Sequence, residues 1–325
     1  MNIVLLASGS RGDVQPYVAL GKGLLQAGHA VRLLTSPDFQ SLVAAHGLEF
    51  VPVGGSTEQV AQSMQALVEA GNMLKILASM GQSARELAVQ FAAAGLAACQ
   101  DADLLIGGFS GLFVGLALSE KLGIPLLQAY LTPMTPTRDF PGVLMPAAPL
   151  PLPAMFNGLS HRLTQQMLWQ SFRGADNKAR AEVLQMPPAP FWGPFGALRQ
   201  RAAPVLYGYS PTVVPPPKDW PGFVTVTGYW LLDPPAGWQP PADLVNFLQA
   251  GPPPVYIGFG SMTSSKPAET AELVLGALAR AGQRGILSAG WGGLTKADLP
   301  SSVFAVGSLP HSWLLPQMAA VVHHG

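Results

Sequence analysis

Short apolar runs alternate with amphipathic stretches over the first 130 residues. The runs at 2–7, 30–35, 49–53, 103–107 and 124–130 have the length of buried β-strands. Helical patterns lie between them at 16–27, 37–46, 57–99 and 111–122, and the glycine-rich turn 8–13 follows the first run. Strands that alternate with helices predict an α/β fold with a parallel, doubly wound sheet.

A second alternation starts near residue 254. Strands are predicted at 254–259, 285–289, 303–306 and 319–323, with a helix at 267–281. A helical stretch at 157–185 and proline clusters at 133–153, 187–194 and 211–241 separate the two alternations. We interpret the last cluster as a connection between domains. The pattern predicts a first α/β domain at 1–211, a proline-rich linker at 212–241 and a second α/β domain at 242–325, with the two domains facing each other across a cleft.

Composition narrows the range of functions. Charged residues make up 11% and the net charge is zero, which argues against a nucleic-acid partner because such proteins carry a basic surface. Cys99 is the only cysteine, so no disulfide framework or cysteine metal site is expected, and a reduced cytosol fits. No signal peptide is evident, and the most apolar window, 104–118, is short and interrupted by glycine. A cytoplasmic protein is expected, with a membrane span at 104–118 as the alternative.

The polar chemistry lies in the turns. Ligands of doubly wound sheets bind at the carboxyl ends of the strands, so segments 8–13, 109–110 and 132–139 should line one crevice. Asp13 in this crevice has two interpretations. It caps a helix or pairs with Arg11, or it is a general base that takes a proton from an acceptor hydroxyl. A dinucleotide site is not expected, because the pattern G-x-G-x-x-G is absent.

Four motifs in order carry a resemblance to a known family. Residues 9–35 read GSRGDVQPYVALGKGLLQAGHAVRLLT, and GFGSM, SAGWGGL and SLPHSWLLPQMAAVVHHG follow at 258–262, 288–294 and 308–325. They resemble the sterol glucosyltransferases and the glycopeptide-antibiotic glycosyltransferases. The resemblance implies the GT-B arrangement of two Rossmann-like domains. It also implies inverting hexosyl transfer from a UDP- or dTDP-sugar to a hydroxyl group, with no metal or other cofactor.

The resemblance also implies roles for single residues. Asp13 matches the catalytic base, and Ser10, Arg11 and Gly12 match its loop on the acceptor side. The nucleotide sugar is expected to contact a set of residues in the second domain: Ser261, Met262, Trp291, Pro310, His311, His324 and Gly325. Two alternatives stay open, since Ser261 could serve only as a helix cap and Trp291 only as a core residue.

The chain ends at VVHHG, where the family continues with a glycine, a helix and a later Asp-Gln pair. We therefore expect the second domain to be incomplete and this chain to be an inactive fragment. The alternative is a binding-only or inert remnant that keeps the acceptor domain.

Apolar loops indicate the class of acceptor. Segments 133–153 and 191–195 are rich in Met, Phe and Trp, which suit a lipophilic molecule such as a lipid, sterol, terpenoid or polyketide. The alternative is that these side chains cover the floor of the cleft. A lipophilic acceptor makes peripheral contact with a membrane a further expectation, and it points to lipid glycosylation or antibiotic biosynthesis.

Overall fold

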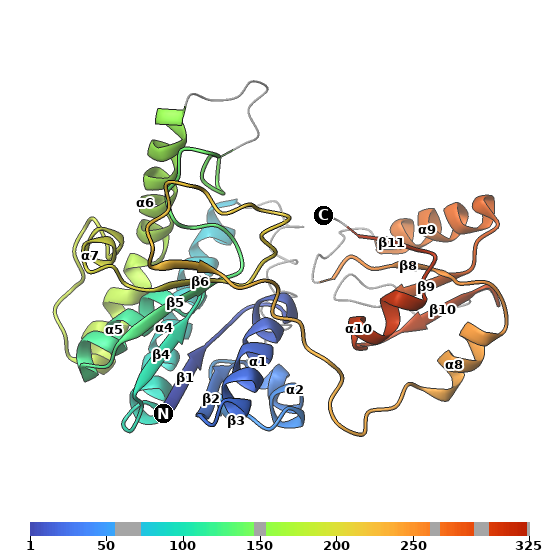
Figure 1. Cartoon of the computed structure of the whole chain (residues 1–325), viewed down its shortest axis with the longest axis horizontal. Helices are drawn as coiled ribbons and strands as arrows, with labels where there is room; N and C mark the ends of the chain where they lie inside the picture. The colour runs from blue at the N-terminus through green and yellow to red at the C-terminus, as the bar shows by residue number, and fades with distance from the viewer. Residues whose placement is uncertain (56–72, 146–153, 261–266, 289–298, 324–325) are drawn as a thin grey trace. The chain divides into compact units, whose positions relative to one another are not determined.

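The computed structural model describes residues 1–55, 73–145, 154–260, 267–288 and 299–323 (Figure 1). These residues form two compact units, which divide between Trp230 and Leu231. Each unit is built around one parallel sheet, so the predicted α/β fold is confirmed.

The sheet of unit 1 has seven parallel strands in the order β3-β2-β1-β4-β5-β6-β7. Its central strands are continuously apolar because helices cover both of their faces: residues 3–6 of β1 are buried throughout. The strand order reverses between β1 and β4, which is where doubly wound sheets bind their ligands. The strands are β1 (Asn2–Leu6), β2 (Ala30–Thr35), β3 (Glu49–Pro52), β4 (Leu104–Gly107), β5 (Leu126–Tyr130), β6 (Val205–Tyr207) and β7 (Val224–Val226).

The helices of unit 1 fill the connections between these strands. They are α1 (Arg11–Gln26), α2 (Gln40–Ala45), α4 (Met73–Ala98), α5 (Leu112–Leu122), α6 (Ala154–Ala179) and α7 (Phe195–Gln200). A 3-10 turn at Pro37–Phe39 leads into α2, and a π-helical turn at Arg180–Leu184 ends α6. The amino-terminal end of α6 extends beyond the rest of unit 1 (Figure 1).

The boundary between the units lies later than the sequence analysis placed it. Segment 212–241 was interpreted as a linker, yet Val224–Val226 pairs with β6 along its whole length and is an edge strand of the first sheet. A three-residue strand flanked by prolines carries no periodic signal, so the sequence pattern did not reveal it. The same holds for β6. Residues 212–230 therefore belong to unit 1.

Helix α1 also begins earlier than expected. The sequence pattern predicted a turn at 8–13 and a helix from Pro16. The structure starts the helix at Arg11 and keeps Pro16 inside it. Ser10 and Asp13 cap the first turn, so the helix gains a turn ahead of the proline.

Unit 2 contains a four-stranded parallel sheet in the order β10-β9-β8-β11. One small apolar cluster covers each face, and α9 packs on one face through Val274 and Leu278. The strands are β8 (Val255–Ile257), β9 (Gly285–Ser288), β10 (Val303–Val306) and β11 (Ala320–Val322). The helices are α8 (Ala242–Gln249), α9 (Pro267–Ala281) and α10 (His311–Leu314), followed by a 3-10 turn at Leu315–Gln317.

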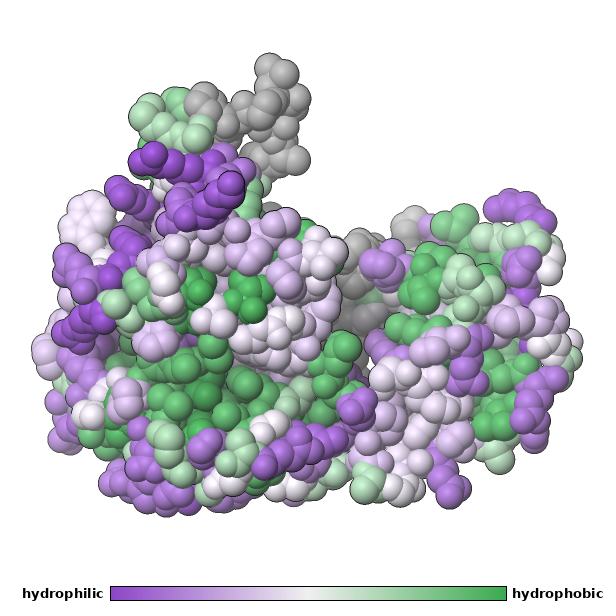
Figure 2. Space-filling view, in the orientation of Figure 1, coloured by the Kyte–Doolittle hydropathy of each residue, from purple (hydrophilic) through white to green (hydrophobic). Residues whose placement is uncertain are grey.

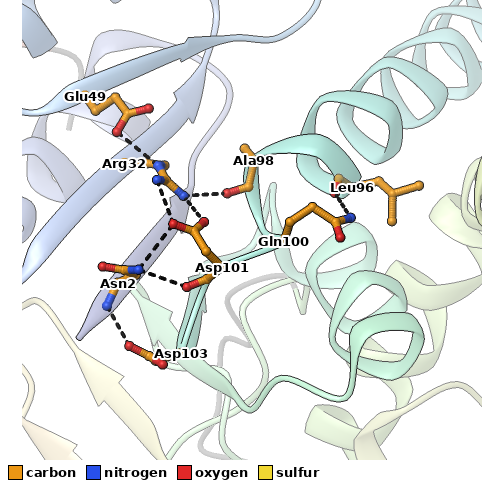
Figure 3. Close-up of polar contacts among 8 residues, drawn as sticks. All are labelled: Asn2, Arg32, Glu49, Leu96, Ala98, Gln100, Asp101 and Asp103. Carbon is orange, nitrogen blue, oxygen red and sulfur yellow. Dashed lines mark hydrogen bonds and ion pairs between the residues drawn. The ribbon is translucent and has the colours of Figure 1, made fainter.

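A polar cluster ties the amino ends of the first strands together (Figure 3). Arg32 on β2 donates to Glu49 Oε2 at 3.0 Å, to the Ala98 carbonyl at 3.0 Å and to the carboxylate of Asp101. Asn2 at the start of β1 donates to Asp101 and Asp103. The hydrogen bonds from Arg32 hold the pKa of Asp101 below its usual value. This cluster lies at the amino edge of the sheet, so its role is to hold the strand ends together.

Candidate functional site

The loops that follow β1 and β4 meet at the carboxyl edge of the sheet. The backbone N–H of Ser8 donates to Ser110 Oγ at 3.0 Å. Gly111 lies directly against the carbonyl of Leu6, where a side chain would have no room. The hydrogen bond between Ser8 and Ser110 joins two of the three segments that were predicted to line one crevice.

The third segment, after β5, is fastened to the neighbouring strand. The Tyr207 hydroxyl of β6 accepts from the backbone N–H groups of Met134, at 2.9 Å, and Thr135, at 2.6 Å. Asp219 then accepts from Thr137 Oγ1 at 2.6 Å and from the Arg138 N–H at 2.9 Å. Met134 is buried, so at this residue the structure favours the interpretation that the apolar loop covers the core.

Asp13 lies in the first turn of α1 with an exposed carboxylate. Its Oδ2 accepts from the backbone N–H and from the hydroxyl of Ser10, both at 2.8 Å. Among the described residues, no hydrogen bond reaches Oδ1. The free N–H groups of the first turn favour a negative charge at this position. Asp13 is thus a helix-capping residue with one oxygen held and the other open to a ligand, which makes its two predicted roles compatible.

Gly9 makes room for this carboxylate. Its φ is +123°, in the region that residues with a side chain rarely adopt. A Cβ atom on Gly9 would lie 2.5 Å from Asp13 Oδ2 and 2.9 Å from Asp13 Cγ. Gly9 was not among the predicted site residues, although a glycine one residue before a helix cap is a signal that could have identified it.

Arg11 and Gly12 complete the first turn. Arg11 Nε donates to Gln15 Oε1 at 2.8 Å, one turn along the helix. Gly12 is exposed, and a Cβ atom there would meet only Ser10 Oγ, at 3.7 Å. Gly12 is therefore not required by packing, and it leaves the space beside Asp13 open.

Tyr17 anchors the start of α1 across the sheet. Its hydroxyl donates to the Ala129 carbonyl of β5 at 2.5 Å, crossing over Gly108, which has no space for a side chain beneath that hydroxyl. Burial and the nearby charge of Asp13 raise the pKa of Tyr17 well above its ordinary value. Tyr17 therefore stays a neutral donor, and it holds the helix one turn beyond Asp13.

The chain after β7 returns across the carboxyl edge to this helix. The ring of Trp230 meets Tyr17 edge-on, with 5.8 Å between centroids, and its Nε1 donates to Thr227 Oγ1 at 2.8 Å. Its indole packs over Gly208, where a Cβ atom would lie 2.7 Å from the ring. Tyr17, Gly108 and Trp230 were not among the predicted site residues, because these contacts join segments far apart in the sequence.

Aromatic side chains form a wall beside the crevice. Phe109, 43% exposed just after β4, meets Phe172 edge-on at 5.7 Å, and Phe172 lies 5.6 Å from Phe113. Phe113 and Trp169 also line a cavity of about 900 Å³ under the proline segment 187–190. Unit 1 therefore offers both an exposed aromatic surface at the carboxyl edge and apolar space of the size of a small-molecule ligand.

Of the predicted donor-side residues, the structure describes two. Pro310 precedes α10, and His311 begins it, in the loop that follows the carboxyl end of β10. His311 Nε2 lies 3.3 Å from the Tyr256 hydroxyl of β8 and remains exposed. Trp313 packs on Trp238 at 5.4 Å, which fixes the short helix. The other five, Ser261, Met262, Trp291, His324 and Gly325, lie outside the described residues.

Comparison with known proteins shows which proteins the chain resembles. Residues 3–141 match the glycosyltransferase family 28 N-terminal domain. Over 332 residues the chain is 37% identical to a sterol 3-beta-glucosyltransferase of Pichia angusta, an alignment that covers 99% of this chain and 26% of that protein. Residues 3–141 thus carry the pattern of this glycosyltransferase domain, and the chain resembles the sterol glucosyltransferases along its length. A sterol 3-beta-glucosyltransferase of Arabidopsis thaliana is 36% identical and is covered to 53% of its length, so the chain spans about a quarter to a half of these relatives.

Solved GT-B glycosyltransferases share the fold. The glycosyltransferase SnogD from Streptomyces nogalater aligns with a TM-score of 0.64 at 19% identity, covering 100% of this chain and 76% of that one. SsfS6 from Streptomyces sp. SF2575, solved with thymidine diphosphate, aligns with a TM-score of 0.58 at 18% identity and the same coverage. Among the helices that the structure describes, none is long and apolar enough to cross a membrane.

Proposed function

We propose that the whole protein transfers a hexosyl group from a nucleoside-diphosphate sugar to a hydroxyl group of a lipophilic, sterol-like acceptor. By the whole protein we mean this chain with any further residues that its gene encodes, because the chain spans only part of its relatives. The family and the fold support transfer of a sugar. The names of the relatives support the sterol-like acceptor.

The observation that carries the proposal is the hydrogen bonding of the Asp13 carboxylate. Asp13 is an exposed residue; Ser10 holds its Oδ2, while Oδ1 accepts no hydrogen bond from the described residues. In the proposed reaction, this carboxylate takes the proton of the acceptor hydroxyl. The hydroxyl oxygen then bonds to the anomeric carbon from the face opposite the leaving group. The bond from that carbon to the phosphate oxygen breaks, and the nucleoside diphosphate leaves with the electron pair. The configuration is inverted.

We place the acceptor on unit 1. Its apolar body would lie against the aromatic wall that starts at Phe109, with its hydroxyl directed toward Asp13. The exposed ring of Phe109 and the open space at Gly12 support this placement, since both leave the approach to the carboxylate clear. A sterol-like body fits this apolar surface better than a charged or sugar-like acceptor does.

We place the donor, a UDP- or dTDP-sugar, on unit 2. The loop of Pro310 and His311 follows a strand end of a parallel sheet, which is where such sheets bind nucleotides. Ser261, Met262, Trp291, His324 and Gly325 complete the proposed donor site. Transfer is proposed to need no metal, because the leaving diphosphate would be met by protein groups.

Replacing Asp13 by Asn tests this mechanism in the whole protein. Asn keeps an oxygen that can accept from Ser10, so the helix cap is preserved while the base is lost. Turnover should fall by about 10² to 10⁴, the usual contribution of a positioned proton acceptor. Nucleotide affinity should stay within a factor of about two, because the donor contacts are assigned to unit 2.

Asp103→Asn is the matched control. Asp103 is also exposed and accepts a backbone hydrogen bond, but it lies at the opposite edge of the sheet. Its replacement should leave turnover unchanged. If Asp13→Asn keeps near-normal turnover, Asp13 is only a capping residue and the proposed mechanism is wrong.

A binding-only protein is the second candidate that the sequence analysis left open. Binding of sterols and of nucleotide sugars, measured separately from turnover, separates the two. Acceptor binding without turnover, for every donor tested with the whole protein, would favour the second candidate.

A further inference from the structure

Helix α6 carries a line of exposed apolar side chains. Met155, Leu159, Leu163 and Met167 follow one another at intervals of four residues, and 73%, 60%, 50% and 47% of their surfaces are exposed. Residues at this spacing lie on one face of a helix. Phe156, 48% exposed, adjoins the first of them. We call these five residues the α6 stripe. Apolar residues gather at the projecting end of α6, next to strongly polar ones (Figure 2).

A rigid turn presents two more aromatic rings. Phe191 and Trp192, 53% and 76% exposed, lie in the turn 190–193, which the N–H of Gly193 closes by donating to the Pro190 carbonyl at 3.1 Å. Gly193 has a φ of +71°, and a Cβ atom there would lie 2.6 Å from the ring of Trp169. The turn is therefore closely packed on α6 while its rings point to solvent.

Hydrogen bonds from α6 fix this turn further. The Phe191 carbonyl accepts from Trp169 Nε1 at 2.9 Å, from Gln170 Nε2 at 2.7 Å and from Gln166 Nε2 at 3.2 Å. The guanidinium of Arg173 lies 5.4 Å from the centre of the Phe191 ring. A large ring held rigidly in water gains nothing for the folded chain, so its exposure indicates a contact surface.

The charged residues nearest the stripe along the sequence are positive. Segment 140–175 contains two arginines, Arg162 and Arg173, and no Asp or Glu. Arg199 Nη1 donates to Gln165 Oε1 at 2.9 Å, which brings a third guanidinium against α6. Burial lowers the pKa of Arg199, and the nearby charge of Arg162 lowers it further. Within the part of the chain that the structure describes, none of these three arginines forms an ion pair.

We infer that the α6 stripe and the 190–193 turn dock on the surface of an anionic lipid bilayer. Apolar side chains flanked by arginines and an exposed tryptophan have the composition of a membrane-interface helix, and a surface of anionic lipid would supply the missing counter-charge. A second copy of the chain fits less well. A symmetric dimer through this face would bring the same unpaired arginines against each other. The inference goes beyond the proposed function and holds whatever reaction the protein catalyses.

Vesicle sedimentation with the 325-residue chain tests the inference. The chain should bind vesicles in which phosphatidylserine replaces part of the phosphatidylcholine, and much more weakly vesicles of phosphatidylcholine alone. Binding should fall as salt rises, because ions screen the attraction of the arginines. The double variant Leu159→Glu, Leu163→Glu should lower the partition coefficient by about tenfold or more, since carboxylates are costly at the lipid boundary.

The control is a double variant of the same chemistry in unit 2. Leu231 and Leu273 are 80% and 67% exposed, so Leu231→Glu with Leu273→Glu should leave both folding and vesicle binding unchanged. Thermal unfolding of both double variants checks that neither loses its fold.

Three results would overturn the inference. The first is absence of binding to anionic vesicles at low salt. The second is equal binding to neutral and anionic vesicles. The third is a loss of binding in the control as large as that in the stripe variant. Sedimentation equilibrium tests the alternative of self-association. If the chain self-associates through the stripe and does not bind vesicles, the surface is an interface between copies.

Discussion

Replacing Gly9 by Ala perturbs the candidate base without touching it. Gly9 has a φ of +123°, and a Cβ atom there would lie 2.5 Å from Asp13 Oδ2. Ordinary contact starts at 3.4 Å, so the carboxylate must retreat by about 0.9 Å. Such a shift would lengthen the 2.8 Å hydrogen bonds from Ser10 beyond hydrogen-bond range.

The cost has two parts that can be separated. The strained backbone should cost about 1–2 kcal/mol of unfolding free energy. Loss of the two bonds from Ser10 should cost about 1–2 kcal/mol more, because both are partly exposed. Gly28→Ala is the control for the first part: its φ is also positive, at +85°, but nothing lies within 4 Å of the added Cβ. Gly28→Ala should therefore cost about 1 kcal/mol.

Denaturant unfolding measures the loss of unfolding free energy in Gly9→Ala and in Gly28→Ala. A double-mutant cycle with Asp13→Ala isolates the contribution of the contact between residue 9 and the Asp13 carboxylate. Removing the carboxylate removes the clash, so Gly9→Ala should cost about 1–2 kcal/mol less in the Asp13→Ala background. In the whole protein, Gly9→Ala should lower turnover toward the level of Asp13→Asn. The reasoning fails if Gly9→Ala costs no more than Gly28→Ala and its effect adds to that of Asp13→Ala.

Three further predictions concern other parts of the molecule. Burial raises the pKa of Asp176 to about 6, so the folded state binds this proton more tightly than the unfolded chain. The unfolding free energy should then decrease by about 2 kcal/mol as pH rises from about 4 to about 7. Asp176→Asn should remove this dependence of the unfolding free energy on pH, while Arg180 stays paired to Glu120. If the dependence is unchanged in the variant, another group causes it. Segment 1–230 should unfold cooperatively at a higher temperature than segment 1–211, which lacks β7 and Trp230. Equal unfolding temperatures would mean that the first domain ends at residue 211. Treatment with EDTA should leave turnover of the whole protein unchanged, whereas a loss restored by added metal would contradict metal-free transfer.

Local sequence pattern determined the alternation of strands and helices. The central strands of unit 1 are buried on both faces, so they appear as continuous apolar runs such as 3–6, and the pattern is visible without any tertiary knowledge. The motif around Asp13 was visible for a similar reason, because a helix cap and its glycine neighbours lie within five residues. The carboxylate that we propose as the base was therefore a candidate from the sequence alone.

Tertiary structure decided what the local pattern does not contain. The strands β6 and β7 have three residues each, too few for a period. They join the sheet only because β6 pairs with β5 and β7 pairs with β6. Tyr17 binds the Ala129 carbonyl over Gly108, and Trp230 returns to meet the same ring. A sequence pattern records which residues one element buries or caps. It does not record which residue from a distant segment contacts that element, because this depends on how the folded chain packs.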